Sequence, residues 1–326
     1  MPDQDLVSVV IPTYKSEEIL PRLYERLVKV FQQMETDYEI IFVCDDSPDE
    51  SWNQLRILAA RDPRVKAVLL RRNFGYDSAL MAGLSLARGD YVVTMDDDLQ
   101  HAPEDMPALL VECKKGHDLV YANFHNKDYS AFKNSGSWLN GVMGRVVLKK
   151  PRDIYLSPYK IIRREVVQEV ILYTGPYPYV DGLLLLATSS IGRIMVGHHG
   201  RAVGQGNYTL MRSLHIWLNH ATGFSVVPLH LTSCIGILLS LIAIVAAVNL
   251  IIWKLMKGEA PEGWATLVVA ITFIGGVQLL ALGVIGEYLG RAYLTINRHS
   301  QYVIKETKNL GGESEPAIRP AKRSSA

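Results

Sequence analysis

The sequence predicts an α/β domain, with a mostly parallel sheet covered by helices on both faces, followed by a membrane-anchoring region. Two observations predict the domain. Short apolar runs alternate four times with segments of helical periodicity up to residue 95, and polar residues follow each run. Such alternation folds through right-handed crossovers into a parallel sheet. The third observation is a change of composition after about residue 220, where two long apolar runs begin.

The elements of the domain follow from the apolar positions. Residues 6–11 form an apolar run that Pro12 ends, as expected for a short strand buried on both faces. A stripe at helical spacing predicts a helix over residues 17–33, with its apolar side at Leu20, Leu23, Leu27 and Val30. The same reasoning predicts strands at 38–43, 65–70 and 91–95, with helices at 51–60 and 78–87.

Beyond residue 100 the pattern weakens. We expect a helix over residues 104–114, a strand over 118–122, a polar connection through residue 137, a helix that starts near residue 163, and an edge strand over 191–198. The order of these strands in the sheet does not follow from the sequence.

Two apolar runs predict a transmembrane hairpin. Residues 226–253 contain no Asp, Glu, Lys or Arg, and 264–285 form the second run. Each is long enough to cross about 30 Å of hydrocarbon. Basic residues beyond the second run place the tail in the cytoplasm: Arg291, Arg298, Lys305 and Lys308. The alternative, two buried helices of a soluble core, is disfavoured because neither run has a polar stripe.

An amphipathic segment precedes the hairpin. Apolar residues at helical spacing predict an interfacial helix, although a core helix fits the same pattern: Leu210, Leu214, Trp217, Leu218 and Ala221. The predicted organisation is a catalytic domain at 1–208, an interfacial helix at 209–225, a hairpin at 226–290 with spans at about 226–253 and 264–288, and a tail at 291–326.

Composition excludes several classes of function. A net charge of +1 gives no reason to expect nucleic acid as a partner. Cys44, Cys113 and Cys234 lack metal-ligand spacing, so we expect neither disulfides nor structural zinc. The N-terminus lacks an apolar stretch of signal-peptide length, so the first domain is expected to face the cytoplasm.

Polar residues at the four strand ends indicate where a ligand binds. They are Pro12-Thr13-Tyr14, Asp45-Asp46, Arg71-Arg72-Asn73 and Asp96-Asp97-Asp98. Because the carboxyl ends of parallel strands share one edge of a sheet, we expect these clusters to converge there.

The three successive carboxylates predict a cation site. Mg²⁺ and Mn²⁺ prefer such oxygen ligands and commonly share them with substrate phosphates. Alternation along an extended segment sends Asp96 and Asp98 to one side and Asp97 to the other. Taken alone, the motif also fits a solvated acidic loop.

The other clusters can also be explained without a bound ligand. Asp46, Ser47 and Asp49 suit a turn, whereas Asp45 is placed to accept a hydrogen bond from a nucleobase. Arg71 and Arg72 could be surface charges, yet an arginine beside a metal site suits diphosphate oxygens.

Together these motifs resemble the family 2 glycosyltransferases, which have the GT-A fold. The segments that carry the resemblance are Val9-Val10-Ile11-Pro12-Thr13-Tyr14, Cys44-Asp45-Asp46-Ser47-Pro48-Asp49, Arg72-Asn73-Phe74-Gly75 and Asp96-Asp97-Asp98-Leu99-Gln100. The paired spans, Gly286-Glu287-Tyr288-Leu289-Gly290-Arg291, and Arg201 with Gly204 and Tyr208 are similar to the polyprenyl-phosphate glycosyltransferases within that family.

The resemblance implies a role for each matching residue. The nucleotide-binding residues would be Pro12, Tyr14, Asp45, Arg72 and Asp97. The metal ligands would be Asp96 and Asp98, and the catalytic residues would be Asp96, Asp98, Gln100 and Arg201. The residues around the acceptor phosphate would be Lys127, Lys133, Ser157 and Lys160.

The chain also departs from the family pattern. Lys15 and Ser16 stand where the family usually has Asn and Glu, and Gly206 and Asn207 replace a Ser-Lys pair. Asp153 fits a polar loop better than a general base. No histidine stands in the metal cluster, which suits an acceptor phosphate that is already anionic.

The implied reaction transfers a sugar, with UDP-glucose as the expected donor, to a polyprenyl phosphate such as undecaprenyl phosphate, with inversion. UDP-aminoarabinose derivatives, UDP-GlcNAc and GDP-mannose are alternative donors, and a processive polysaccharide synthase or a non-catalytic scaffold are alternative functions. The expected location is the inner membrane, with several spans. Small residues could let spans associate in a homo-oligomer: Gly275, Gly276, Gly283 and Gly286.

Overall fold

The computed structural model describes residues 5–124, 154–197, 227–257, 263–297 and 299–310. The chain divides into two compact units. Met1–Asn207 and His299–Ala326 form the first, which we call the sheet unit, and Tyr208–Arg298 form the second, the helical unit.

The sheet unit contains one mixed sheet. In chain order its strands are β1 (Leu6–Thr13), β2 (Asp37–Cys44), β3 (Val65–Leu70), β4 (Tyr91–Thr94), β5 (Leu119–Phe124), β6 (Lys160–Arg163), β7 (Ile191–Val196) and β8 (Ile304–Lys308). Their order across the sheet is β7-β5-β6-β4-β1-β2-β3-β8. β4, β1, β2 and β3 run parallel, as do β5 and β7, whereas β6 and β8 pair antiparallel with their neighbours.

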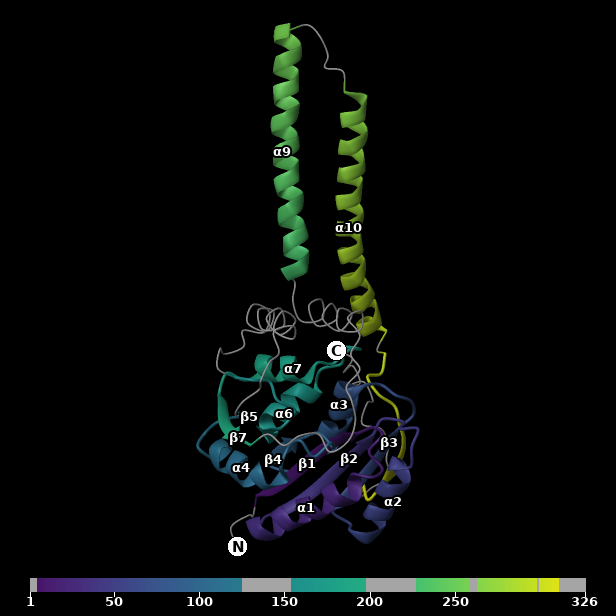
Figure 1. The fold of residues 1–326 in the computed structure, drawn as a ribbon, viewed down its shortest axis with the longest axis vertical. Helices are drawn as coiled ribbons and strands as arrows, with labels where there is room; N and C mark the ends of the chain where they lie inside the picture. Colours follow the sequence, from purple (N-terminus) through teal and green to yellow (C-terminus); the bar gives the residue numbers. More distant parts are fainter. Residues whose placement is uncertain (1–4, 125–153, 198–226, 258–262, 298, 311–326) are drawn as a thin grey trace, which may run out of the picture. The chain divides into compact units, whose positions relative to one another are not determined.

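Helices cover both faces of this sheet (Figure 1). One face packs α1 (Leu20–Met34), α2 (Ser51–Arg61) and α4 (Met106–Lys114), preceded by the short helix η1 (Pro103–Asp105). The other packs α3 (Tyr76–Leu86), α6 (Arg164–Ile171) and α7 (Val180–Ala187). Strand residues alternate between the two cores, so that Ile40 and Phe42 belong to the first and Ile41 to the second. The predicted α/β fold is confirmed.

Most predicted elements are present with small shifts in their ends. The first helix begins at Leu20 rather than at residue 17, with Pro21 in its first turn. The strand expected at 191–198 is β7, and it lies at an edge of the sheet as predicted.

The sequence did not predict two strands. β6 lies between β4 and β5, and the helix expected near residue 163 follows it as α6. β8 comes after the apolar runs and pairs with β3, with its register shifted between Leu69 and Leu70. Both strands are short, and β8 has a single apolar residue, Ile304, followed by charged and polar residues.

The described part of the helical unit consists of two long helices, α9 (Val227–Lys257) and α10 (Trp264–Ile296). Within the described residues, Phe273–Ile296 is the one segment long and apolar enough to cross a membrane. Large apolar side chains on both helices are exposed, among them Leu238, Ile244, Phe273 and Leu282. Such a surface needs lipid or another apolar surface to cover it. The predicted interfacial helix at 209–225 lies outside the described residues.

Candidate active site

The loops after β1 and β4 are joined through Asp97. Its Oδ2 accepts hydrogen bonds from the backbone N–H of Tyr14, at 3.3 Å, and from the hydroxyl of Ser16. Asp97 therefore points toward the β1 loop, on the side expected from alternation. Burial raises the pKa of Asp97 to about 6, against the effect of these two hydrogen bonds.

The loops after β2 and β3 are joined through Asp45. Its carboxylate oxygens accept the N–H groups of Phe74, at 2.7 Å, and Gly75, at 2.8 Å. Burial raises the pKa of Asp45 above its ordinary value although these N–H groups oppose the shift. The guanidinium of Arg72 lies 4.6 Å from the centre of the Phe74 ring. Predicted clusters from neighbouring strands thus meet, as expected for one sheet edge.

Three loops of this edge contain a residue with positive φ that is not glycine. They are Lys15 with φ 59°, Asp46 with φ 50° and Leu99 with φ 58°. The left-handed region is unfavourable for such side chains, so the surrounding contacts must hold the backbone there. Strained backbone of this kind concentrates at binding and catalytic sites.

Asp96 is half-buried. Its side chain shares a hydrogen bond with Tyr76, the first residue of α3, and Oδ1 is buried with no hydrogen-bond partner among the described residues. Burial, followed by the nearby charge of Asp98, raises the pKa of Asp96 to about 7. A buried carboxylate oxygen without a partner is costly unless a proton or a cation compensates it.

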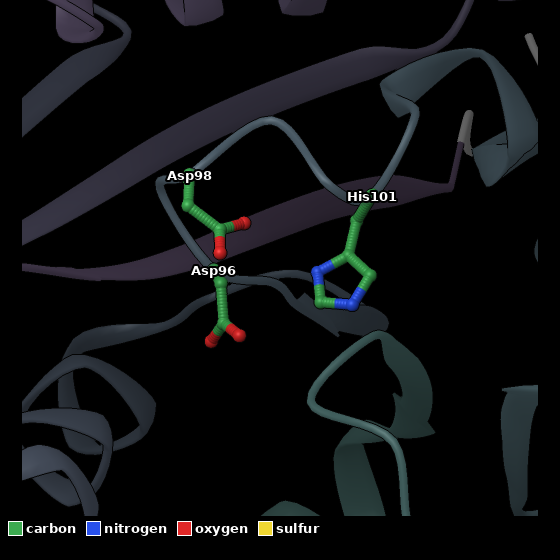
Figure 2. A group of neighbouring side chains, drawn as sticks. All are labelled: Asp96, Asp98 and His101. Carbon is green, nitrogen blue, oxygen red and sulfur yellow. The ribbon is translucent and has the colours of Figure 1, made fainter. Parts of the chain in front are cut away.

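Asp98 and His101 lie beside Asp96. Figure 2 shows the three side chains gathered on one side of the loop after β4, and one ligand atom from each lies within 4.8 Å of the others. The backbone N–H of Gln100 donates to Asp98 Oδ1 at 3.0 Å, which closes a tight turn at Leu99. Two carboxylates and an imidazole are a plausible donor set for a divalent cation.

The expectation of a cluster without histidine was wrong. His101 is only 4% exposed, and its ring packs against Tyr159 at 5.5 Å between centroids. Leu99 and Gln100 form a turn between Asp98 and His101. The acidic motif alone therefore does not show that His101 lies beside the carboxylates. A histidine right after an acidic motif was the one available signal.

Two predicted acceptor residues are buried. Lys160 is 1% exposed and pairs with Asp181, whose Oδ1 also accepts the Tyr121 hydroxyl at 2.8 Å. Ser157 is fully buried, and its Oγ accepts the N–H of Tyr159 at 3.2 Å. Their role toward an acceptor phosphate stays a prediction.

Asp181 and its neighbour Asp77 were not singled out from the sequence. Burial raises the pKa of Asp77 to about 6; the charge of Asp181 adds to this, whereas the Val180 N–H and Lys160 act against it. No motif marks either aspartate, since α7 is a short apolar helix with a single acid in its first turn.

The remaining predicted residues differ in how far the structure describes them. Pro12 is buried in β1, whereas Tyr14 just beyond it is 46% exposed. Arg72 is exposed. Lys127, Lys133, Asp153 and Arg201 lie outside the described residues, and their roles stay predictions.

Comparison with known proteins identifies relatives along nearly the whole chain. The model of glycosyl transferase family 2 matches residues 8–171. The undecaprenyl-phosphate 4-deoxy-4-formamido-L-arabinose transferase of Proteus mirabilis is 32% identical over 303 residues, 92% of this chain and 93% of that protein. The transferase of the same name from Aeromonas hydrophila is 33% identical over 314 residues, 93% of this chain and 94% of that protein.

Solved structures are similar over a smaller part of the chain. Glucosyl-3-phosphoglycerate synthase from Mycobacterium tuberculosis, in complex with Mn²⁺ and UDP-glucose, has a TM-score of 0.49 at 18% identity. The similarity covers 68% of this chain and 80% of that one.

The family match runs from β1 to the end of α6 and includes every loop of the converging edge. The resemblance inferred from the four motifs and the GT-A fold it implies are therefore confirmed. This chain is a glycosyltransferase and belongs to glycosyl transferase family 2.

Proposed function

We propose that this glycosyltransferase transfers a sugar from a nucleotide sugar to a polyprenyl phosphate, with inversion at the anomeric carbon. One observation carries the proposal: transferases named for undecaprenyl phosphate match over 92% to 93% of the chain, a share that must include much of the helical unit. A match confined to the catalytic domain would have supported glycosyl transfer, but not a polyprenyl phosphate as the acceptor.

Asp96 and Asp98 would hold a divalent cation, Mg²⁺ or Mn²⁺. The residues fit such an ion, because Asp96 Oδ1 is buried without a hydrogen-bond partner in the described part of the chain, and ligand atoms of Asp98 and His101 lie within 4.8 Å of one from Asp96. When bound, the ion would neutralise charge on the departing diphosphate.

The rest of the edge would bind the nucleotide. Tyr14, exposed beside the buried Pro12, offers a ring face to the base, and Asp45 fixes the neighbouring loop that carries Arg72. Asp97 would hold the β1 loop in place through Tyr14 and Ser16. Gln100 would approach the sugar or the acceptor, and Arg201 the phosphates.

The acceptor phosphate would attack directly. One of its oxygens forms a bond to the anomeric carbon as the bond from that carbon to the diphosphate breaks, and the electron pair leaves with the nucleoside diphosphate. Because the attacking oxygen is already anionic near neutral pH, no strong base is needed. Lys127, Lys133, Ser157 and Lys160 are the proposed residues around the acceptor phosphate.

The apolar helices would anchor the enzyme where its lipid acceptor resides. Phe273–Ile296 has the length and composition of a span. We propose a multi-pass protein of the inner membrane, with the sheet unit as a catalytic domain on the cytoplasmic side and the hairpin, interfacial helix and tail arranged as the sequence predicts.

The donor has two candidates. The motifs favour UDP-glucose by resemblance to the bactoprenol glucosyltransferase branch, whereas the names of the relatives favour 4-deoxy-4-formamido-L-arabinose as the sugar. We propose uridine diphosphate as its carrier, as the family resemblance implies. Both share the nucleotide, so the edge described above serves either donor.

The test is transfer by the full chain in detergent or nanodiscs. Each labelled donor is incubated with undecaprenyl phosphate and Mn²⁺ or Mg²⁺, and the lipid fraction is analysed by mass spectrometry. A lipid carrying one sugar is expected with one of the two donors. Longer sugar chains would instead indicate a processive synthase, and the absence of any lipid-linked sugar with all common donors would refute the proposal.

Substitution of the acidic pair gives the first prediction. Asp98→Asn keeps the size of the side chain but removes its charge, and we expect transfer to fall by at least about 100-fold. Glu169→Gln, an exposed site on α6, serves as the matched control and should retain activity. Full activity in both Asp96→Asn and Asp98→Asn would favour a function other than metal-dependent transfer.

A further inference from the structure

We propose that His101 is a third protein ligand of the metal ion, and that its imidazole makes the site prefer Mn²⁺ over Mg²⁺. The inference rests on the proposed function, because it takes Asp96 and Asp98 as the other two ligands.

The spacing of the three side chains suits a single ion. One ligand atom from each of Asp96, Asp98 and His101 lies within 4.8 Å of the other two. Two ligands of an octahedral ion with bonds near 2.1 Å are about 3 Å apart when adjacent and about 4 Å apart when opposite. The three groups must therefore move closer by at most about 2 Å to share one ion, and rotation of the carboxylate side chains can provide this shift.

The backbone turn places His101 beside the acidic pair. Leu99 adopts φ 58°, and the Gln100 N–H closes back onto Asp98 Oδ1 at 3.0 Å. This reversal brings position 101 to the side of the loop where Asp96 and Asp98 lie (Figure 2). An extended chain would have carried His101 away from both carboxylates.

The imidazole is held in place before any ion binds. His101 is 4% exposed, and its ring lies against Tyr159, which is fully buried. The Tyr159 hydroxyl donates to the carbonyl of Ala102, the next residue after the histidine, at 3.1 Å. A ligand fixed in this way loses little side-chain entropy on binding metal, which is how supporting contacts raise metal affinity.

The charge of the cluster also favours a cation. Of the residues that the structure describes, none donates a hydrogen bond to the buried Asp96 Oδ1, and the charge of Asp98 acts on the same carboxylate. The competing explanation is that His101 serves only as a charged hydrogen-bond donor to the carboxylates. The two roles differ in one respect, since only a ligand shares electron spin density with a bound paramagnetic ion.

Nitrogen ligation would change the choice of ion. Mg²⁺ is a hard cation that takes oxygen ligands almost exclusively, whereas first-row transition ions accept imidazole nitrogen as well. A site with two carboxylates and one imidazole should therefore bind Mn²⁺ more tightly than Mg²⁺, and much of that preference should depend on His101.

The decisive experiment is pulsed electron paramagnetic resonance on the full chain in detergent. Protein labelled with ¹⁵N-histidine is loaded with Mn²⁺ alone and with Mn²⁺ plus UDP. We expect a directly bound ¹⁵N coupling in the wild-type chain and its loss in His101→Asn. His299→Asn, an exposed position, is the matched control and should retain the coupling. Bound Mn²⁺ without ¹⁵N coupling in the wild-type chain would overturn the inference.

A metal titration tests the selectivity. His101→Asn should weaken Mn²⁺ binding by about tenfold or more while changing Mg²⁺ competition by about threefold at most. An equal loss for the two ions would overturn the proposed preference. Because the coupling is measured on the wild-type chain, a variant that misfolds does not remove the test.

Failure of this inference can be told apart from failure of the proposed function. If Mn²⁺ binds, Asp98→Asn abolishes that binding, and no histidine nitrogen couples to the ion, then His101 is excluded and the glycosyl transfer reaction stands. If the wild-type chain forms no lipid-linked sugar with any donor, the proposed function itself fails.

Discussion

Glu39 on β2 shows how a buried charge is compensated by groups from two neighbouring strands and a loop. Its carboxylate pairs with Lys66 on β3, and accepts hydrogen bonds from the Ser8 hydroxyl on β1, at 2.5 Å, and the Arg88 N–H, at 2.7 Å. Glu39 and Lys66 are 5% and 8% exposed. Breaking such a pair leaves one buried charge without a partner.

Lys66→Met should therefore destabilise the protein strongly. We expect the free energy of unfolding to fall by about 3–5 kcal/mol, with partial recovery in the double variant that adds Glu39→Gln. The measurement is thermal or urea unfolding of the detergent-solubilised chain. Lys115→Met, in the exposed pair with Glu112, is the control and should change stability little. Similar losses in both variants would contradict this account.

The same carboxylate predicts a dependence of stability on pH. Burial works against the charged form of Glu39, but the hydrogen bonds from Lys66, Ser8 and Arg88 hold its pKa below its ordinary value. Its stabilisation is therefore complete above the unfolded-state pKa of about 4.3, and is lost as the pH falls through the lower folded-state pKa. The melting-temperature gap between wild type and Glu39→Gln should narrow below about pH 4. A gap that does not change with pH would contradict this.

Individual site residues were predictable where strand position alone fixes them. Asp96 and Asp98 follow a strand, so alternation was enough to place them on one side. His101 and Asp181 were not predictable in this way. His101 depends on the positive φ of Leu99, and Asp181 depends on how α7 packs beside β5 and β6. Tertiary placement decides both, and no local pattern encodes it.

At the level of elements, helix α3 packs unusually close to the sheet. A Cβ atom at Gly83 would lie 2.2 Å from Val10 Cγ1 and 3.2 Å from Val43 Cγ2. Both valines are fully buried in central strands and have stiff side chains. The glycine therefore sets the distance between α3 and the strands that end at the site.

Gly83→Ala should push α3 away from β1 and β2. We expect a loss of about 1–3 kcal/mol in stability. Transfer activity should fall as well, because α3 begins at Tyr76, which shares a hydrogen bond with Asp96. Gly236→Ala is the helical control and should not reduce stability, because no atom of the described residues lies within 4 Å of the added Cβ. Thermal unfolding and transfer assays compare the two, and an unchanged Gly83→Ala would contradict the proposed contact.

The elements that alternate regularly were predictable, and the two antiparallel strands were not. β1 to β4 and the helices between them have apolar patterns long enough to separate strand from helix. β6 has four residues and leads directly into α6, and β8 is charged and distant in sequence from its partner. A long-range pairing such as β3 with β8 leaves almost no local signal.

At the level of the whole molecule, the sheet unit is built from two separated parts of the chain. Residues after the helical unit return to it, where the Val303 carbonyl accepts the Arg71 N–H at 2.8 Å. Asn309 Nδ2 donates to the carbonyls of Ala59, Asp62 and Val65, at 2.5, 3.2 and 2.9 Å. One side chain thus ties the returning segment to the end of α2 and the start of β3.

The returning segment contains none of the proposed substrate-binding residues. Its removal should nevertheless impair the enzyme. Truncation after Arg298 deletes β8 and leaves the edge of β3 unpaired, so we expect a lower melting temperature and loss of transfer. Truncation after Leu310 keeps β8 and Asn309 and should retain both properties. Wild-type behaviour of the shorter chain, measured by thermal unfolding and transfer, would show that β8 is dispensable.

The pairing of β8 with β3 also restricts the path of the chain through a bilayer. Residues before 208 and after 298 belong to one folded unit, which cannot lie on both sides of a membrane. If the chain is anchored in a membrane as we propose, the polypeptide between them must cross it an even number of times. Phe273–Ile296 would then need a second span to return the chain to the same side, and the 31 residues of α9 have the length for it.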